Sequence, residues 1–427
     1  MPSPPLPPAG PTIWRTVRHE RTVLFVVQNL TTLNRLLDVL PVFEGDLRVQ
    51  CQVTSDLDDP FVDGLPEAIA GLGLPALSWD QARTQAFDLV VSAGHHGALA
   101  RLHGPSVLLS HGIGFSKYSP GAAPAGPPTA VYGMDPRWLL RDGEPFMAAL
   151  GYSHPDQIEQ LATAVPAAVP RASLVGDPCF DRLCASAGSR AAFRARLGTG
   201  DRRLVLISST WSGSSLLGQC PRLVDQLVTG LDPDAYQVLL VAHANIHAWH
   251  GPHQVRMWLA GALRAGLVLI PPQVGWQAAL LAADLVVGDH GSVTVYGAGL
   301  GRPVLLAAFP DDEVVPGSAV HRLGALADRL EPGRPPADQV RQLSRSADPE
   351  RPADPERFAD PERPGGPERF AEVRALITSA PGESVRRLRE LCYRLLRLDP
   401  PAGQAHPQPY PAEDLPLLAT SRTPTHG

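Results

Sequence analysis

The sequence is almost without lysine. Lys117 is the one lysine among 37 basic side chains, and the other 36 are arginine. A phosphate-binding loop of the GxxxxGK[ST] kind needs a lysine followed by serine or threonine, whereas Tyr118 follows Lys117. The chain is therefore not expected to be a P-loop NTPase.

Other signals are also missing. The five cysteines form no CxxC pair, which suits a reducing cytoplasm and gives no zinc signature. Residues 1–11 are rich in proline and carry no charged side chain, so they lack the basic n-region of a signal peptide. No apolar run approaches the roughly 18 residues of a membrane span. We predict a cytoplasmic protein.

The charge balance is mildly acidic. With 43 acidic and 37 basic side chains the net charge is −6, which argues against a dedicated nucleic-acid binder, because neutralising phosphates needs a basic face. Apolar residues make up 44% of the chain, enough for sizeable cores. A length of 427 residues suggests two or three domains.

Proline marks the domain organisation. Residues 1–12 and 332–427 hold half of the 46 prolines, so we expect tails around a globular part at 13–331. We predict six parts: a disordered tail (1–12), an N-terminal Rossmann-like acceptor domain (13–190), a C-terminal Rossmann-like nucleotide-donor domain (191–331), a Pro/Glu/Arg repeat linker (332–370), an amphipathic basic helix (371–399) and a disordered tail (400–427).

The linker contains a repeat of six residues. Asp-Pro-Glu-Arg begins at Asp348, Asp354 and Asp360, and a worn copy, in which glycine replaces the aspartate, begins at Gly366. So short a charged unit cannot bury a core, so we interpret it as an extended spacer, with a functional epitope as the alternative. Two interpretations of the basic helix that follows the linker are open. It could make peripheral contact with the inner face of an anionic membrane, or dock back on the globular part, which we favour.

Short β-branched runs alternate with helical patterns through the globular part. This alternation predicts an α/β fold with two doubly wound parallel sheets, and a ligand cleft at the carboxyl ends of their strands. The predicted strands are 23–28, 49–54, 88–92, 106–110, 171–176, 204–208, 237–242, 267–270, 285–288 and 304–307.

Three strand ends carry residues suited to chemistry. An apolar strand runs into His111-Gly112-Ile113-Gly114, where histidine suits a general base and glycine admits a close ligand. A second strand leads into the hydroxyl-rich loop 208–215, and clustered hydroxyls can hold a diphosphate. A third ends before Asp289. Ser292 and the first amides of the following helix could bind phosphate, or Asp289 could cap that helix and oppose it.

Four histidines follow the strand at 237–242. They are His243, His247, His250 and His253, and Gly251-Pro252 interrupts any single helix through them. No acidic residue lies among them, so we predict no metal site and take His243, at the strand end, as the site residue.

Together these segments resemble the bacterial glycosyltransferases of GT-B architecture, most of all the CDP-glycerol glycerophosphotransferases of the teichoic-acid type. The likeness to nucleotide-sugar epimerases is weaker. The matched residues are His111, Gly112 and Lys117 in the first segment, Thr210 and Trp211 in the second, His243 in the third, and Asp289, Ser292, Val293, Gly301, Pro303 and Val304 in the fourth. Gly291 and Tyr296 depart from the family pattern, and Ala242 stands where the family has proline.

The resemblance implies a cell-envelope transferase that needs neither metal nor cofactor. It would move a glycosyl or polyol-phosphate group from a nucleotide-activated donor to an acceptor hydroxyl. His111 and His243 would be catalytic, with His111 accepting the acceptor's proton. Gly112, Lys117, Thr210, Trp211, Asp289, Ser292 and Val293 would bind the donor or its phosphates. The alternatives are a non-catalytic nucleotide-binding or scaffold protein on the same fold, and a nucleotide-sugar epimerase.

Overall fold

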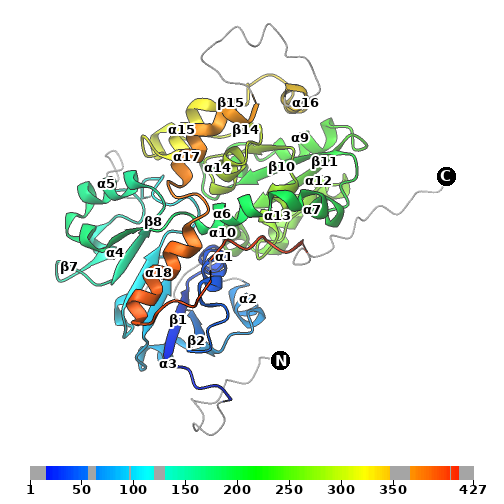
Figure 1. The fold of residues 1–427 in the computed structure, drawn as a ribbon. Coiled ribbons are helices and arrows are strands. Elements are labelled where there is room, and N and C mark those ends of the chain that lie inside the picture. Colours follow the sequence, from blue (N-terminus) through cyan, green and yellow to red (C-terminus); the bar gives the residue numbers. More distant parts are fainter. Residues whose placement is uncertain are drawn as a thin grey trace. The chain divides into compact units, whose positions relative to one another are not determined.

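The computed structural model divides the chain into two compact units (Figure 1). Unit 1 comprises Met1–Gly114, Ala130–Asp181 and Ser379–Pro407, and unit 2 comprises Phe115–Thr129, Arg182–Thr378 and Gln408–Gly427. Within them the structure describes residues 16–55, 64–95, 98–119, 130–346, 366–403 and 405–412. The predicted tail at 1–12 falls outside these ranges, as do residues 413–427 and the three intact Asp-Pro-Glu-Arg copies, whereas residues 405–412 of the other predicted tail are described and the N–H of Tyr410 donates to the hydroxyl of Ser186 at 2.8 Å.

Unit 1 is built on a parallel sheet of seven strands. Its order is β3-β2-β1-β4-β5-β8-β9, so the chain starts in the middle, moves to one edge, and then crosses β1 to build the other half. The strands are β1 (Arg21–Val27), β2 (Val49–Ser55), β3 (Ala76–Leu77), β4 (Leu89–Ser92), β5 (Ser106–Leu109), β8 (Ala149–Tyr152) and β9 (Ala172–Leu174). A short antiparallel pair, β6 (Leu140–Arg141) and β7 (Glu144–Pro145), stands apart.

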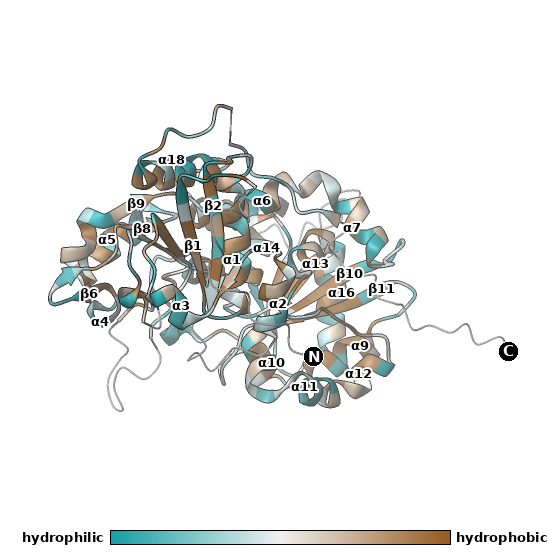
Figure 2. Ribbon diagram, turned by 90° about the horizontal axis from the view of Figure 1, so that it is seen from below, coloured by the Kyte–Doolittle hydropathy of each residue, from teal (hydrophilic) through white to brown (hydrophobic). Residues whose placement is uncertain are grey.

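Unit 2 repeats the plan with six parallel strands in the order β12-β11-β10-β13-β14-β15, which is the 3-2-1-4-5-6 order of a Rossmann sheet. The strands are β10 (Arg203–Ser209), β11 (Tyr236–Ala242), β12 (Val268–Leu269), β13 (Leu285–Gly288), β14 (Val304–Leu306) and β15 (Asp328–Arg329). The hydropathy colouring of Figure 2 shows β10 and β11 in brown, in keeping with strands that are apolar and covered on both faces.

Helices connect the strands of each sheet. Those of unit 1 are α1 (Leu30–Val39), α2 (Leu65–Gly71), α3 (Trp79–Arg83), α4 (Pro136–Leu139), α5 (Pro155–Ala164) and α18 (Ser384–Leu396). Those of unit 2 are α7 (Arg190–Arg196), α8 (Leu216–Gln219), α9 (Leu223–Gly230), α10 (Ala244–His250), α11 (Pro252–Trp258), α12 (Ala260–Arg264), α13 (Trp276–Ala282), α14 (Ser292–Gly299), α15 (Ala319–Leu326), α16 (Pro336–Ser346) and α17 (Ala371–Ile377). Helix α6 (Pro178–Ala185) begins in unit 1 and ends in unit 2.

The predicted fold class is confirmed, and every predicted strand is present within a few residues of its expected ends. Three strands of the main sheets were not predicted. β3 and β15 are two residues long, too short for any pattern, and β8 reads Ala-Leu-Gly-Tyr, without a β-branched residue.

The C-terminal part differs from the predicted linker and single helix. Residues 336–346 of the expected linker form α16, and the expected helix at 371–399 is two helices that lie in different units, α17 in unit 2 and α18 in unit 1. Proline at the start of α16 is compatible with a first helical turn, so the high proline content of this region did not exclude a helix. The worn repeat copy is also placed, because Arg369 forms an ion pair with Asp328 at 2.9 Å.

Helix α18 docks on unit 1 through its apolar face. Val385, Leu388, Leu391 and Leu396 are buried, and the hydroxyl of Tyr393 donates to Asp46 at 2.9 Å. This is the docked alternative, and it leaves the apolar face of α18 unavailable to a lipid surface. Across the residues that the structure describes, no helix has the length and apolar character needed to cross a membrane.

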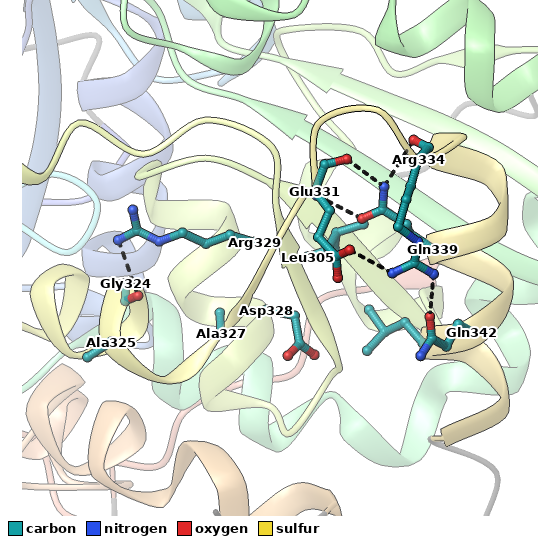
Figure 3. A pocket seen from close by; sticks show the side chains of 11 residues that line it. Leu305, Gly324, Ala325, Ala327, Asp328, Arg329, Glu331, Arg334, Gln339 and Gln342 are labelled. Atoms are coloured by element: carbon teal, nitrogen blue, oxygen red, sulfur yellow. Dashed lines mark hydrogen bonds and ion pairs between the residues drawn. The ribbon is translucent and has the colours of Figure 1, made fainter. Parts of the chain in front are cut away.

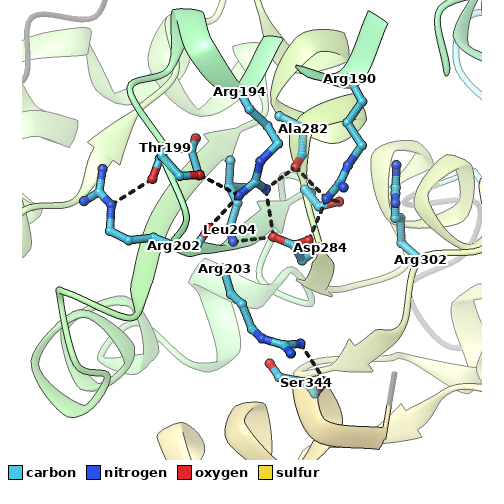
Figure 4. Close-up of polar contacts among 12 residues, drawn as sticks. Arg190, Arg194, Thr199, Arg202, Arg203, Leu204, Ala282, Asp284, Arg302 and Ser344 are labelled. Atoms are coloured by element: carbon cyan, nitrogen blue, oxygen red, sulfur yellow. Dashed lines mark hydrogen bonds and ion pairs between the residues drawn. The ribbon is translucent and has the colours of Figure 1, made fainter. Parts of the chain in front are cut away.

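A cluster of arginines holds the amino-terminal end of the central strands of unit 2 (Figure 4). The carboxylate of Asp284 pairs with Arg190 at 2.6 Å and with Arg194 at 2.9 Å, and it accepts the backbone N–H of Leu204 at 2.7 Å. Burial alone would raise the pKa of Asp284, but the Leu204 N–H and the two guanidinium groups outweigh it and lower the pKa below the ordinary value. Asp284 thereby fixes α7 and β10 to the start of β13.

Asp284→Asn is therefore expected to lower the free energy of unfolding by about 1–3 kcal/mol at neutral pH, since the guanidinium groups lose their anion. Because the folded-state pKa is depressed, the stabilisation is complete above the unfolded-state pKa and is lost as the pH falls through the folded-state value. Urea unfolding at neutral and successively lower pH should show the two proteins converging. Asp311→Asn, in the exposed pair with Arg329, is the control and should change stability by less than about 1 kcal/mol.

Candidate functional site

The strand order of unit 2 points to one place for a ligand. The chain leaves β10 toward β11 on one side and later toward β13 on the other, and ligands of such sheets bind beyond the carboxyl ends of the strands where the order reverses. Ser209 of β10 is in register with Ala242 of β11, and Ile207 with Val287 of β13. The segments that follow these three strands therefore begin side by side.

Asp289 organises this edge. Its side chain is fully buried and accepts three backbone N–H groups, from Thr210 at 2.9 Å, Leu216 at 2.8 Å and Gly291 at 2.9 Å. One carboxylate thus ties the loop after β10 and the start of α8 to the turn after β13. Burial raises the pKa of Asp289, while the Leu216 N–H, the charge of Lys117 and the other two N–H groups act in the opposite direction.

The lone lysine lies in unit 2 rather than unit 1. The chain passes from unit 1 to unit 2 between Gly114 and Phe115, and residues 116–118 pair with the segment that follows β14. Lys117 forms an antiparallel bridge with Val314, and the N–H of Tyr118 donates to the carbonyl of Glu313 at 3.1 Å. These backbone contacts bring Lys117 to the same edge as Asp289.

The charges around Lys117 form a small network. Burial lowers the pKa of Lys117, while the charges of Asp289 and Glu313 raise it. Glu313 also accepts the hydroxyl of Ser214, from the loop after β10, at 2.8 Å. His290 is buried, and burial together with the charge of Lys117 lowers its pKa to about 3, so it is neutral at pH 7. Lys117 is therefore the basic side chain that interacts with the carboxyl groups of Asp289 and Glu313 at this edge.

The amino end of α14 adjoins Asp289. Asp289 does not cap this helix, because its oxygen accepts the N–H of Gly291, and in the described chain no side chain caps α14. Ser292 and Val293 are the first two helical residues, both partly exposed. A methyl group on Gly291 would lie 3.0 Å from Asp289 Oδ1 and 3.2 Å from Thr210 Cβ, so glycine allows this close turn. The alternative prediction, in which Asp289 caps α14, is therefore wrong.

His243 and Trp211 extend the edge toward β11. Their rings lie 6.4 Å apart, and Trp211 is partly exposed. His243 is the N-cap of α10, and its Nδ1 accepts the N–H of Asn245 at 3.1 Å. In neutral His243 the proton is therefore on Nε2, which makes that nitrogen a hydrogen-bond donor.

The other three histidines of this segment do not join His243. His247 is buried in α10, whereas His250 and His253 are exposed. Among the residues that the structure describes, no group of three or more His, Cys, Asp or Glu side chains is placed to hold a metal ion.

His111 lies in unit 1, at the end of β5. Its Nδ1 is 2.9 Å from the carbonyl oxygen of Ala93, and since a carbonyl only accepts, Nδ1 carries the proton. Neutral His111 therefore has its lone pair on Nε2, the opposite tautomer to His243. A residue with a side chain would clash at Gly114, where an added Cβ would lie 2.6 Å from Ser110.

A buried ion pair supports the loop of His111. Arg35 of α1 pairs with Asp177 at 2.9 Å, and both side chains are at least 96% buried. The same guanidinium donates to the carbonyl of Gly112 at 2.7 Å, next to His111, while Asp177 accepts the N–H of Phe180 in α6. Arg35 therefore joins the His111 loop to the start of α6.

Comparison with solved structures now identifies the architecture. Structures of the wall teichoic acid polymerase TagF match 89% of this chain and 90% of theirs at 14% identity, with TM-scores of 0.57 for a histidine-to-asparagine variant soaked with CDPG and 0.58 for that variant alone. The chain has the GT-B fold. Anabaena Alr3699/HepE in complex with UDP-glucose overlaps less well, with a TM-score of 0.47 at 14% identity over 88% of this chain and 99% of that one. No protein-family model and no curated protein matches the sequence.

Gly291 and Tyr296 depart from the pattern of the family that the sequence resembles, and the structure gives a reason for each. Gly291 permits the close turn at Asp289, as above. Tyr296, where the family usually has an acidic residue, is buried and stacks on Trp276 with ring centroids 6.0 Å apart. Tyr296 is thus a packing residue of unit 2.

A pocket of about 400 Å³ lies elsewhere in unit 2, between β15, α15 and α16 (Figure 3). Its polar lining is largely paired with itself: Arg334 contacts Glu331 and Gln342, each at 2.9 Å, and Gln339 donates to the carbonyl of Glu331 at 3.0 Å. None of the predicted site residues lines it. The strand-end edge, rather than this pocket, is the candidate site.

Several residues of the His111 loop's support and of the strand-end edge were not singled out individually from the sequence. Glu313 and Ser214 join it through the segment after β14 and the loop after β10. The run Asp311-Asp312-Glu313 after a predicted strand was the available signal for Glu313. Arg35 gave no signal, because one arginine in an amphipathic helix resembles a solvent-exposed side chain.

Proposed function

We propose that this protein transfers a glycosyl or polyol-phosphate group from a nucleotide-activated donor to an acceptor hydroxyl, without a metal or cofactor. The observation that carries the proposal is the placement of Lys117. A residue from the first half of the chain belongs to unit 2 and forms an isolated bridge with Val314, in the segment after β14, near the strand ends where ligands of such sheets bind. The fold shared with TagF, of which one structure was obtained after a CDPG soak, supports a nucleotide donor.

In this proposal unit 2 binds the donor. Lys117 supplies the positive charge for the donor's phosphates, and His243 Nε2–H and the hydroxyl of Ser292 donate to their oxygens. The uncapped amino end of α14, including the N–H of Val293, favours negative charge at the same place. Thr210 and Asp289 fix these groups, and Trp211 offers an aromatic face to the nucleotide.

His111 is proposed as the general base. Its Nε2 lone pair takes the proton of the acceptor hydroxyl as that oxygen attacks the transferred group. The bond from the transferred group to the departing nucleotide phosphate breaks, and the negative charge left on that phosphate is stabilised by Lys117 and the other donors. Gly112 lets the acceptor approach the loop closely. We place the protein in the cytoplasm, in keeping with five described cysteines that form no disulfide.

One observation favours the alternative of a nucleotide-binding protein without catalysis. Tyr296 packs in the core where the resembled family has an acidic side chain, so whatever that acid supplies is missing at this position. Under this alternative, unit 2 binds the nucleotide and no group is transferred.

A thermal-shift screen of the full chain with CDP, UDP, GDP and their sugar or glycerol conjugates tests the proposal. A ligand that binds only the folded state stabilises it by about 2.7 kcal/mol at a hundredfold excess over Kd. Binding of a conjugate, followed by release of its nucleotide with an acceptor, supports transfer. Binding without release supports the alternative, and no binding by any nucleotide contradicts both.

The single lysine allows a sharper test of the donor site. An amine-reactive acylating reagent can label only Lys117 and the terminal amino group. We expect a bound nucleotide conjugate to suppress labelling of Lys117 but not of the terminus, as read by peptide mass spectrometry. Lys117→Met should weaken nucleotide binding roughly tenfold or more, by loss of one charged hydrogen bond, while Arg345→Met should not. Equal labelling of Lys117 with and without nucleotide would argue against its role.

A further inference from the structure

Helices α10 and α11 of unit 2 carry three large apolar side chains on the surface. Trp249 is 67% exposed, Met257 57% and Trp258 56%. The ring of Trp258 lies 4.9 Å from that of His250, so the end of α11 is held against the end of α10. We call Trp249, Met257 and Trp258 the tryptophan patch.

Packing of the fold does not account for the patch. Val255 and Leu259 are the residues of this segment that enter the core of unit 2, together with Ile246 from α10 and Ala262 from α12. Met257 and Trp258 lie between those core positions in sequence and point away from the core. More than half of each of these three side chains is exposed, and covering that apolar surface would be favourable.

The formal charge carried by α10 and α11 themselves is positive only. Residues 235–283, which include α10, α11 and α12, contain no aspartate or glutamate, although acidic residues number 43 in the chain. Arg256 and Arg264 are the cations of this stretch, and both are exposed. From the neighbouring α9, Asp225 lies close to Gly261 of α12. An anionic surface would meet arginine and no acidic side chain along α10 and α11.

The size of the patch favours a lipid surface over a protein partner. The exposed parts of its three side chains amount to on the order of 400 Å². A stable protein interface buries about 800 Å² on each partner, so the patch alone is too small for one. A few tryptophans beside basic residues are sufficient for the interface of a bilayer, where the ring is buried and its N–H stays near the head groups.

We propose that the tryptophan patch docks unit 2 on a bilayer that contains anionic lipid. The surface is distinct from the C-terminal helix, whose apolar face is occupied by unit 1. It also lies close to the proposed donor edge, since His243 caps the amino end of α10 and Trp249 stands near the other end of that helix of seven residues, roughly 10 Å long. The docking does not depend on the proposed transfer reaction.

Co-sedimentation of the full chain with vesicles tests the docking. We expect binding to phosphatidylcholine vesicles containing phosphatidylglycerol, weaker binding at high salt, and little binding to phosphatidylcholine alone. The double variant Trp249→Ser/Trp258→Ser should lose at least tenfold in vesicle affinity. Arg256→Gln should lose about fivefold, the factor equivalent to about 1 kcal/mol for one basic residue near an anionic surface. Brominated lipid should quench the tryptophan emission of the unaltered protein and leave the double variant much less affected.

Leu47→Ser is the matched control, because Leu47 is an exposed apolar residue in unit 1, and it should bind vesicles as well as the unaltered protein. Leu47→Ser and Arg256→Gln should keep the thermal unfolding midpoint of the unaltered protein, and the double variant, which loses the ring contact between Trp258 and His250, should remain folded with a slightly lower midpoint. Absence of binding to the anionic vesicles would overturn the proposal, as would full binding by the double variant. Concentration-dependent self-association abolished by the same double variant, without vesicle binding, would instead assign the patch to a protein contact and also overturn it.

Discussion

Replacing His111 by alanine is expected to lower turnover by about 10²–10⁴-fold, the usual contribution of a well-placed general base. The carbonyl of Ala93 holds the Nδ1 proton of His111, so the lone pair of the neutral ring is on Nε2. Alanine removes that base without altering unit 2. Nucleotide affinity, measured by thermal shift, should therefore stay within about twofold while the rate of nucleotide release with an acceptor falls.

His103→Ala is a suitable control for this prediction, because His103 is an exposed histidine of the same unit. It should leave both the rate and the affinity unchanged. If His111→Ala retained full turnover, His111 would not be the base. If it lost nucleotide affinity by the same factor as rate, the histidine would act in binding instead.

Most of the fold could be predicted from the sequence, because parallel strands that are covered on both faces are continuous apolar runs. The runs at 204–208, 237–242 and 285–288 each gave a strand of the unit 2 sheet, and their order along the chain is the order expected for a Rossmann domain. The strands that were not predicted are stabilised by pairing with neighbouring strands. β15, for example, is an Asp-Arg dipeptide that aligns with Leu305 and Leu306 of β14.

Site residues could be predicted from the sequence where they come directly after a predicted strand. Thr210, His243 and Asp289 each come immediately after a recognisable strand. The interactions of Lys117 with Asp289 and Glu313 were not predictable by spacing, because they depend on the chain entering unit 2 at Phe115 and pairing with Val314. The resemblance named Lys117 as a site residue, but only the backbone pairing explains how it reaches β13.

The C-terminal segment shows what helical periodicity cannot predict. The periodicity at 385–396 identified an amphipathic helix, but periodicity describes a face and not what covers it. The contact between Tyr393 and Asp46 joins residues 347 positions apart, and no local pattern signals such a pair. Burial of this face on unit 1 is why the tryptophan patch, rather than α18, is the surface we assign to lipid.

Removing the guanidinium of Arg35 should produce the largest loss of stability in unit 1. Arg35→Ala leaves Asp177 buried without its partner, and breaking a buried ion pair in this way costs about 3–5 kcal/mol. The carbonyl of Gly112 loses its donor at the same time. Chemical unfolding should show the loss of stability. In the molecules that remain folded, turnover should fall more than nucleotide affinity, because Gly112 adjoins His111 in unit 1.

Two comparisons separate this buried pair from an ordinary one. Arg83→Ala breaks the exposed pair with Asp80 in the same unit, and should cost less than about 1 kcal/mol. The double variant Arg35→Met/Asp177→Leu removes both charges and should recover most of the stability, since an uncompensated charge is the main penalty. It should not recover turnover, because methionine cannot donate to the Gly112 carbonyl. Recovery of both would mean that Arg35 stabilises unit 1 without positioning the His111 loop, whereas recovery of stability alone would assign it both tasks.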